Sequence, residues 1–161
     1  MRRTVIIAII LFGLDAFWLN QGMVALVTVM IVLPIMIIKA LVRWKNKPLL
    51  KKRLAACGIY LLMSLLIFGS ISLNNKIARS RAGMLIATCE KYKDKNNKYP
   101  EKLSDLVPEF IKKIPVAKYT LASNRFFYIS SKNSHILFYT SMPPSGRPTY
   151  SFEKQKWAYI D

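Results

Sequence analysis

The sequence predicts a membrane-anchored protein, with a helical N-terminal half of two to three membrane spans followed by a small α+β domain. In that domain one long helix is expected to pack on a three- to four-stranded antiparallel sheet. Hydrophobic residues make up 53% of the chain and concentrate in its first 73 positions, which is high for a soluble domain. The apolar run at 54–73 continues into a helical pattern without a proline, and aromatic and β-branched segments follow residue 125.

The first two apolar runs predict a helical hairpin. Residues 4–19 form a run of 16, which covers about 24 Å as a helix and is marginal for crossing a bilayer. We favour an uncleaved span over a signal peptide, because no small-x-small cleavage site follows. The polar residues 20–22 predict a tight turn. Residues 23–41 are long enough to cross, with a kink expected at Pro34.

The distribution of basic residues predicts the orientation. Seven Lys and Arg residues and no acidic residue lie between the second and third apolar runs, most of them in a loop expected at 42–53. They are Lys39, Arg43, Lys45, Lys47, Lys51, Lys52 and Arg53. Such a loop is typical of the cytoplasmic side of a membrane and of its anionic inner leaflet. Everything after residue 73 is therefore expected outside the cytoplasm, although Lys76, Arg79 and Arg81 favour the opposite orientation.

The net charge of +17 by itself could indicate nucleic-acid binding, but no binding motif accompanies it. We therefore expect lipid and protein partners and no nucleic acid.

The C-terminal half predicts a helix followed by strands. A helical stripe should place one apolar face of the long helix on a core; its members are Ala78, Ala82, Leu85, Cys89 and Tyr92. Residues 95–98 end this helix, and Pro100 begins a short helix that runs to Val107. Strands are expected at 125–130, 135–140, 149–153 and 157–160. A four-residue loop at 131–134 and a loop at 142–148 are expected to separate them.

This half of the chain resembles a known family. The features that carry the resemblance are a long helix leaving the membrane, a Tyr-Pro step, a Leu-x-x-Leu helix, an Ile-Pro stop and a late Trp. They are Tyr92, Tyr99, Pro100, Leu103, Leu106, Val107, Pro108, Ile114, Pro115 and Trp157. The pattern resembles the extracytoplasmic head of type II secretion pseudopilins and type IV pilin-like proteins of bacteria. The resemblance covers residues 70–161.

The sequence also departs from that family. It has no acidic residue between Asp15 and Glu90, and two extra hydrophobic runs precede the long helix, whereas prepilins carry a short leader and an early Glu. Peptidase processing and filament assembly are therefore not expected.

The domains expected are a membrane hairpin with its basic cytoplasmic loop at 1–53, a membrane helix that leaves the bilayer at 54–95, and a pseudopilin-like extracytoplasmic domain at 75–161.

Asp15 is the one ionisable residue inside an expected span. It either finds a partner within a helix bundle or lies close enough to the outer interface to stay hydrated.

Of the two cysteines, Cys57 and Cys89 would lie about 48 Å apart along one continuous helix and so cannot pair with each other. Cys89 is either a buried small residue or the site of an intermolecular disulfide to a partner.

The chemistry-bearing residues predict no enzyme. His135 is the only histidine and is expected to be a solvated surface residue beside a Ser-rich turn. Two distant cysteines, one histidine and scattered acidic residues give no metal-ligand spacing, so no metal or cofactor is expected. The alternative, an enzyme that uses His135 as its base, predicts an activity lost on its replacement.

The aromatic residues of the first strand suggest a binding surface. Phe126 and Tyr128 alternate with Phe127 and Ile129, so both faces of this strand are apolar. A single helix covers only one face of so small a sheet. The other face is either closed by the loop at 142–148 or bound by a protein partner, with Arg147 beside it.

These observations predict a non-enzymatic, multi-pass protein of the bacterial inner membrane. Its extracytoplasmic head binds other proteins, as an accessory to a secretion or pilus system. The alternative is a membrane-anchored immunity or inhibitor protein that acts on an extracytoplasmic toxin or hydrolase, since a basic head suits an acidic partner.

Overall fold

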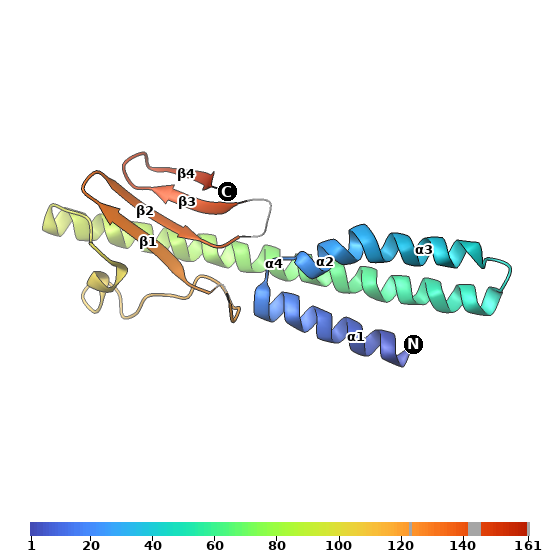
Figure 1. Ribbon diagram of the computed structural model, residues 1–161. Coiled ribbons are helices and arrows are strands. Elements are labelled where there is room, and N and C mark those ends of the chain that lie inside the picture. The colour runs from blue at the N-terminus through green and yellow to red at the C-terminus, as the bar shows by residue number, and fades with distance from the viewer. Residues whose placement is uncertain (123, 142–145, 161) are drawn as a thin grey trace. The chain divides into compact units, whose positions relative to one another are not determined.

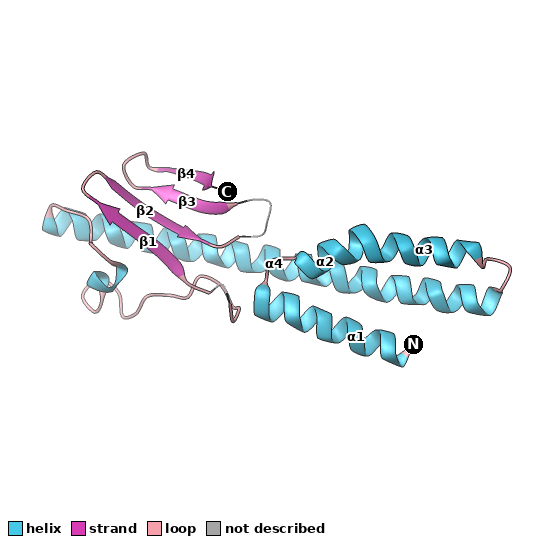
Figure 2. Ribbon diagram, in the orientation of Figure 1, coloured by secondary structure: helices cyan, strands magenta, loops and turns pink. Residues whose placement is uncertain are grey.

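The computed structural model describes residues 1–122, 124–141 and 146–160. The chain divides into two compact units, Met1–Ser72 and Leu73–Asp161. Helix α4, Lys47–Asn96, contributes its N-terminal part to the first unit and its C-terminal part to the second. The first unit is helical, whereas the second combines the end of α4 with a sheet (Figures 1 and 2).

The first unit begins with a helical hairpin. Its elements are α1 Arg2–Gly13, the π-helical turn η1 Leu14–Leu19, α2 Met23–Val27, the π-helical turn η2 Thr28–Val32 and α3 Leu33–Val42. The predicted turn lies between η1 and α2, where Asn20 and Gly22 adopt left-handed backbone angles, with φ of 51° and 75°. Pro34 lies in the first turn of α3, directly after the π-helical turn. This position tolerates a residue without an N–H group.

In the first unit, the distribution of apolar residues between surface and interior is the reverse of that in a soluble helical protein. Its buried positions are mainly small residues, among them Ala8, Ala16, Ala25 and Ala40. Its exposed positions are mainly large aliphatic side chains, such as Leu62 and Leu65. Small residues inside and large apolar residues outside are typical of helices that pack in lipid. Two helices, Met23–Val42 and Lys47–Asn96, are long and apolar enough to cross a membrane.

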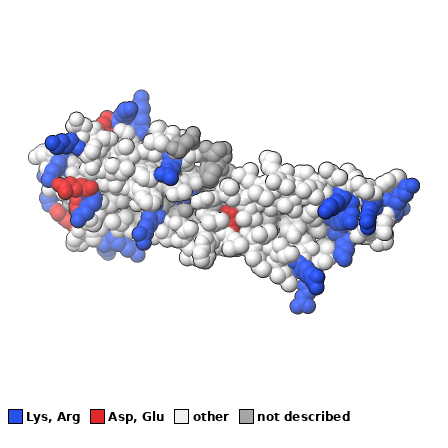
Figure 3. All heavy atoms as spheres, viewed as in Figure 1, with Lys and Arg blue, Asp and Glu red and all other residues white. Residues whose placement is uncertain are grey.

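The basic segment is not the twelve-residue loop that the sequence predicted. Helix α3 ends at Val42 and α4 begins at Lys47, so the prediction of a loop at 42–53 is wrong. Asn46 Oδ1 accepts the backbone N–H of Leu49 at 3.1 Å and caps α4, and Pro48 lies in the first turn, where proline is tolerated. The basic residues from Lys47 to Arg53 are therefore helical. Figure 3 shows Lys and Arg gathered at the end of the first unit that carries the α3–α4 connection.

The second unit is a helix-on-sheet domain. Helix α4 ends at Asn96, and Asn97 follows it with a left-handed φ of 57°. The remaining elements are the 3₁₀ turn η3 Leu103–Leu106 and strands β1 Phe126–Ser131, β2 Ser134–Tyr139, β3 Arg147–Ser151 and β4 Lys156–Ile160. The strands form one antiparallel sheet in the order β1-β2-β3-β4, which lies against α4 (Figure 1). A long helix on an antiparallel sheet of three to four strands was predicted; this part of the prediction is confirmed, and the sheet has four strands.

The core lies between α4 and the inner face of the sheet. Four of the five residues of the stripe predicted on the helix are buried: Ala78, Ala82 and Cys89 are fully covered and Leu85 is 1% exposed, whereas Tyr92 is only partly buried at the margin of the core. Leu103, Leu106, Ala117, Phe126, Leu137, Tyr139 and Phe152 complete the buried cluster. The alanines matter because small side chains let the aromatic rings of the sheet approach the helix closely.

Three local predictions need correction. The β1–β2 connection has two residues rather than four, because Ser131 pairs with Ser134 in the ladder. Strand β3 begins at Arg147, inside the predicted loop 142–148; residues 142–145 lie outside the described part of the chain. The predicted helix from Pro100 to Val107 is only the turn Leu103–Leu106. There the Asp105 carboxylate accepts the N–H groups of Glu101 and Lys102 and holds the chain in a tight turn.

The core packing predicts a large difference between two neighbouring positions of α4. Leu85→Ala should destabilise the second unit by about 2–5 kcal/mol, because it leaves a cavity in a closed core. Met84 is 57% exposed, so Met84→Ala should cost less than about 0.5 kcal/mol. Hydrogen exchange of β2 amides, measured on the full chain in detergent, should accelerate at least thirtyfold in the first variant only. Equal exchange in both variants would contradict this core.

Candidate functional site

The two faces of β1 have different roles. Phe126 is 9% exposed within the core, and the Tyr128 hydroxyl donates to the carbonyl of Pro100 at 3.0 Å. Phe127 and Ile129 are 47% and 53% exposed on the opposite face. Phe126 and Tyr128 are therefore not part of the exposed face of the sheet: they face α4, as strand alternation requires once Phe126 is buried. Phe127 and Ile129 remain candidates.

The outer face of the sheet is apolar across its strands. Phe127 stacks on Phe138 of β2, with 5.1 Å between ring centroids, and Ile129 lies opposite Ile136 in the same ladder. Ile129, Ile136, Phe138, Arg147, Thr149 and Ile160 surround a shallow hollow of about 140 Å³. We call this surface the outer face. Arg147 is exposed at its side, so the predicted grouping of Arg147 with Phe127 and Ile129 corresponds to one surface.

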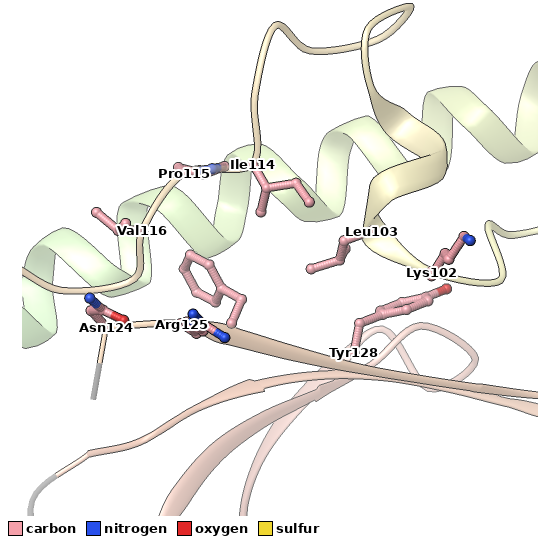
Figure 4. Close-up of a pocket in the computed structure, with 9 residues that line it drawn as sticks. Lys102, Leu103, Ile114, Pro115, Val116, Asn124, Arg125 and Tyr128 are labelled. Carbon is pink, nitrogen blue, oxygen red and sulfur yellow. The ribbon is translucent and has the colours of Figure 1, made fainter. Parts of the chain in front are cut away.

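A larger pocket lies beside the edge of β1 (Figure 4). Its volume is about 440 Å³, and we call it the edge pocket. It is lined by Lys102, Leu103, Ile114, Pro115, Val116, Asn124, Arg125, Phe126 and Tyr128. Three chain segments that are distant in sequence contribute these side chains, so no local pattern identified the pocket. The Ile-Pro pair at 114–115 was noted only as the end of a helix.

His135 is not the solvated residue that the sequence suggested. Its side chain is 15% exposed, its Nδ1 lies 2.7 Å from Glu153 Oε1, and its ring packs on Tyr99 at 4.8 Å between centroids. The Tyr99 hydroxyl in turn donates to the Glu90 carboxylate at 2.9 Å. The prediction of a solvated His135 was wrong because its partner, Glu153, lies 18 positions away and is not evident from the local sequence.

This pair lacks the other parts of a nucleophilic site. Ser151 Oγ lies 3.3 Å from Glu153 Oε2 and donates to the carboxylate rather than to the imidazole. Among the described residues no hydroxyl or thiol is hydrogen-bonded to the His135 ring, and no group of three metal-ligating side chains occurs. The contacts suit a structural pair that fixes the start of β2 to the β3–β4 turn.

Cys89 lies at the centre of the core and is fully buried. Burial raises the pKa of its thiol to about 12, with a smaller contribution from the neighbouring Glu90. A thiol that is protonated and covered by the sheet does not react with an external disulfide. The hypothesis of an intermolecular disulfide at Cys89 is corrected accordingly, and Cys89 acts as a small apolar core residue.

Asp15 closes the turn of the N-terminal hairpin. Its carboxylate is fully buried and accepts backbone N–H groups of the turn and of the first residues of α2. The donors are Gln21 at 3.2 Å, Gly22 at 2.8 Å, Val24 at 2.9 Å and Ala25 at 3.3 Å. These N–H groups are the ones that a helix start leaves without partners. The partner of Asp15 is therefore backbone, an arrangement that the sequence alternatives, a bundle partner or hydration, did not include.

Lys118, like Asp15, is buried, but no feature of the sequence predicted its burial. It is 1% exposed, and burial lowers the pKa of its ammonium group to about 8. No hydrogen bond to this group occurs among the described residues. Its backbone neighbours are fixed, since Ala117 N–H donates to Asn124 and Tyr119 N–H donates to Asn74 of α4.

Comparisons with protein-family models, curated proteins and solved structures find no match to this chain. They therefore assign neither a family nor a function. The pseudopilin resemblance remains a prediction from the sequence pattern.

The Asp15 contacts predict a local effect of substitution. Asp15→Asn places an amide NH₂ group among N–H donors and should destabilise the hairpin turn by about 1.5–3 kcal/mol. Exchange of the Gly22, Val24 and Ala25 amides should rise at least tenfold in detergent. Leu14→Ala, at a position that is 46% exposed, serves as the control and should leave these amides protected. Unchanged exchange in the Asn variant would exclude this role.

The His135–Glu153 pair predicts an acid-dependent contribution to stability. Partial burial acts to raise the pKa of the Glu153 carboxyl, but hydrogen bonds from the His135 ring and backbone outweigh it, so the pKa is lowered. A carboxyl with a lowered folded-state pKa stabilises the fold above its unfolded value, near 4.5, and loses this contribution as pH falls through the folded value. Because the Glu153 side chain is 35% exposed, solvent screens the pair and its contribution is at most about 1 kcal/mol.

Thermal unfolding of the full chain at pH 6 and pH 3.5 tests this dependence. Wild type should lose more stability on acidification than Glu153→Gln, whereas Glu101→Gln should behave as wild type, because the exposed Glu101 side chain has no partner among the described residues. Identical pH dependence in all three proteins would show that the pair contributes nothing.

Proposed function

We propose that this protein is a non-enzymatic integral protein of the bacterial inner membrane. Its pilin-like domain outside the cytoplasm binds other proteins as an accessory to a secretion or pilus system. The observation that carries the proposal is the exposed outer face on a domain whose other sheet face is already closed by α4. An apolar surface of this kind on a folded domain marks a protein-interaction site.

Membrane anchoring is supported by two long apolar helices and by the large aliphatic side chains on the surface of the first unit. The orientation is supported by the basic residues at the α3–α4 connection. Arg53 donates a hydrogen bond to the carbonyl of Lys39, near the end of α3, so the basic residues lie together where two helices end. Basic residues flanking short connections stay in the cytoplasm.

The composition of the outer face supports a protein as its ligand. Stacked aromatic rings, branched aliphatic side chains and a flanking arginine are the residue types enriched at protein interfaces. A non-enzymatic role is supported by the His135–Glu153 geometry, in which the available hydroxyl is bonded to the carboxylate.

The proposal predicts a partner that depends on the outer face. The full chain, purified in mild detergent, should carry envelope secretion or pilus components with it. Phe127→Asp combined with Ile129→Asp should abolish this recovery, because two charges would be buried at the interface. Met84→Asp is the matched control at an exposed apolar position of α4 and should retain the partner. A protein purified as a monomer, without partners in either background, would contradict the proposal.

A second candidate function is that of an immunity or inhibitor protein against an extracytoplasmic toxin or hydrolase. The observation in its favour is the charge of the second unit, where 16 basic and seven acidic residues leave +9 after Leu73. A basic head attracts acidic partners over a long range. Protection of cells against a toxin from a neighbouring gene would distinguish this function from the first.

A further inference from the structure

Strand β1 is a free edge of the sheet. In the described residues it pairs only with β2, and no other backbone hydrogen bond reaches it. An edge strand presents unpaired N–H and C=O groups and acts as a template for another strand. Natural edges are usually protected by proline or inward charges, but β1 has the sequence FFYISS and contains neither. This edge is therefore chemically available for strand addition.

The edge pocket lies where an added strand would place a side chain. Its walls are apolar, formed by Leu103, Ile114 and Val116 on one side and by Tyr128 of β1 on the other (Figure 4), and Phe126 of β1 also lines it. A volume of about 440 Å³ accommodates a large aliphatic side chain. Ile114 and Val116 are 38% and 44% exposed, so apolar surface remains to be covered there.

The charges beside this edge select an acidic ligand. Arg125, which precedes β1, borders both the edge pocket and a second hollow of about 410 Å³ beside Phe127. Its guanidinium group has no hydrogen-bond or ion-pair partner in the described residues, and Lys102 adds a second positive charge on the rim.

The acidic residues of the second unit are largely engaged in contacts of their own. Glu90 accepts from Tyr99, Glu109 pairs with Lys95, and Glu153 pairs with His135. Asp105 accepts the backbone amides that begin η3. Few carboxylates are therefore available to neutralise Arg125. A second copy of this chain is a poor occupant as well, because each second unit carries +9.

We propose that the free edge of β1 binds an extended acidic segment of a partner protein as a fifth strand. One apolar side chain of that segment fills the edge pocket, and neighbouring carboxylates bind Arg125 and Lys102. The inference rests on the proposed protein-binding function and names the site and the chemistry of the partner. It uses strand addition, in which main-chain hydrogen bonds provide affinity and alternate side chains provide specificity.

A synthetic peptide serves as the probe. A fluorescent peptide that alternates valine and aspartate over the six-residue length of β1 is titrated into the full chain in a neutral detergent and followed by anisotropy. Two N-methylated versions carry methyl groups on alternate amides, in opposite sets. Only one set of amides faces the edge in a ladder, so one version should bind at least tenfold more weakly and the other should bind as the parent does.

Protein variants test the pocket and the charge separately. Arg125→Ala should weaken binding about tenfold through loss of a charge-assisted contact. Lys156→Ala removes the same charge at the start of β4, the opposite edge, and should change binding less than about twofold. Val116→Trp fills the edge pocket without changing charge and should weaken binding about tenfold. Protected β2 amides in each variant show that the domain is folded.

Several results would overturn the inference. They are equal binding of the two methylated peptides, equal effects of the Arg125 and Lys156 substitutions, no binding of the parent peptide at millimolar concentration, or binding only after a dimer of this chain dissociates. In cells, a partner retained by Arg125→Ala and Val116→Trp but lost with the Phe127 and Ile129 substitutions would exclude the edge site and leave the proposed function standing. Loss of the partner in all of these variants, with Lys156→Ala unaffected, supports both.

Discussion

The second unit depends on the fit between the small-residue face of α4 and the aromatic inner face of the sheet. Ala78, Ala82 and Cys89 leave room for Phe126 and Tyr139, and Leu85 fills the remaining space among them. One helix covers one face of a four-stranded sheet. Among the residues that the structure describes, the packing that makes the domain stable therefore also leaves the outer face and the edge of β1 without an intramolecular cover, and both candidate binding surfaces follow from it.

The first unit follows a different constraint. In lipid, a backbone N–H group without a partner is costly, and the start of α2 leaves several such groups near a turn. The Asp15 side chain accepts hydrogen bonds from them, so an ionisable residue that looks out of place in an apolar run fits the requirement of the turn. Small buried residues and large exposed aliphatic residues complete the pattern. In our proposal this unit is an anchor, and the role of Asp15 in it is structural rather than part of a proton or ion pathway.

The sequence predicted the features that have a strong local signal. The helical stripe on α4 and the aromatic strands were evident because periods of 3.6 and 2 are each repeated over several residues. The basic loop was predicted wrongly because Pro48 and a run of lysines resemble a loop, whereas Asn46 and Pro48 in fact begin a helix. Alternation separated Phe126 and Tyr128 from Phe127 and Ile129, but it did not indicate which pair faces the core. The edge pocket and the His135–Glu153 contact join distant segments, and a single sequence gives no measure of such proximity.

We propose that the second unit lies on the side of the membrane opposite the α3–α4 connection. The most direct measurement is the activity of two reporters fused after Asp161, alkaline phosphatase, which is active only outside the cytoplasm, and green fluorescent protein, which is fluorescent only inside. Fusions truncated at Asn46, in the connection itself, provide the reference for the cytoplasmic side. We expect active phosphatase and no fluorescence after Asp161, with the opposite pattern at Asn46. Fluorescence and an inactive phosphatase after Asp161 would contradict it.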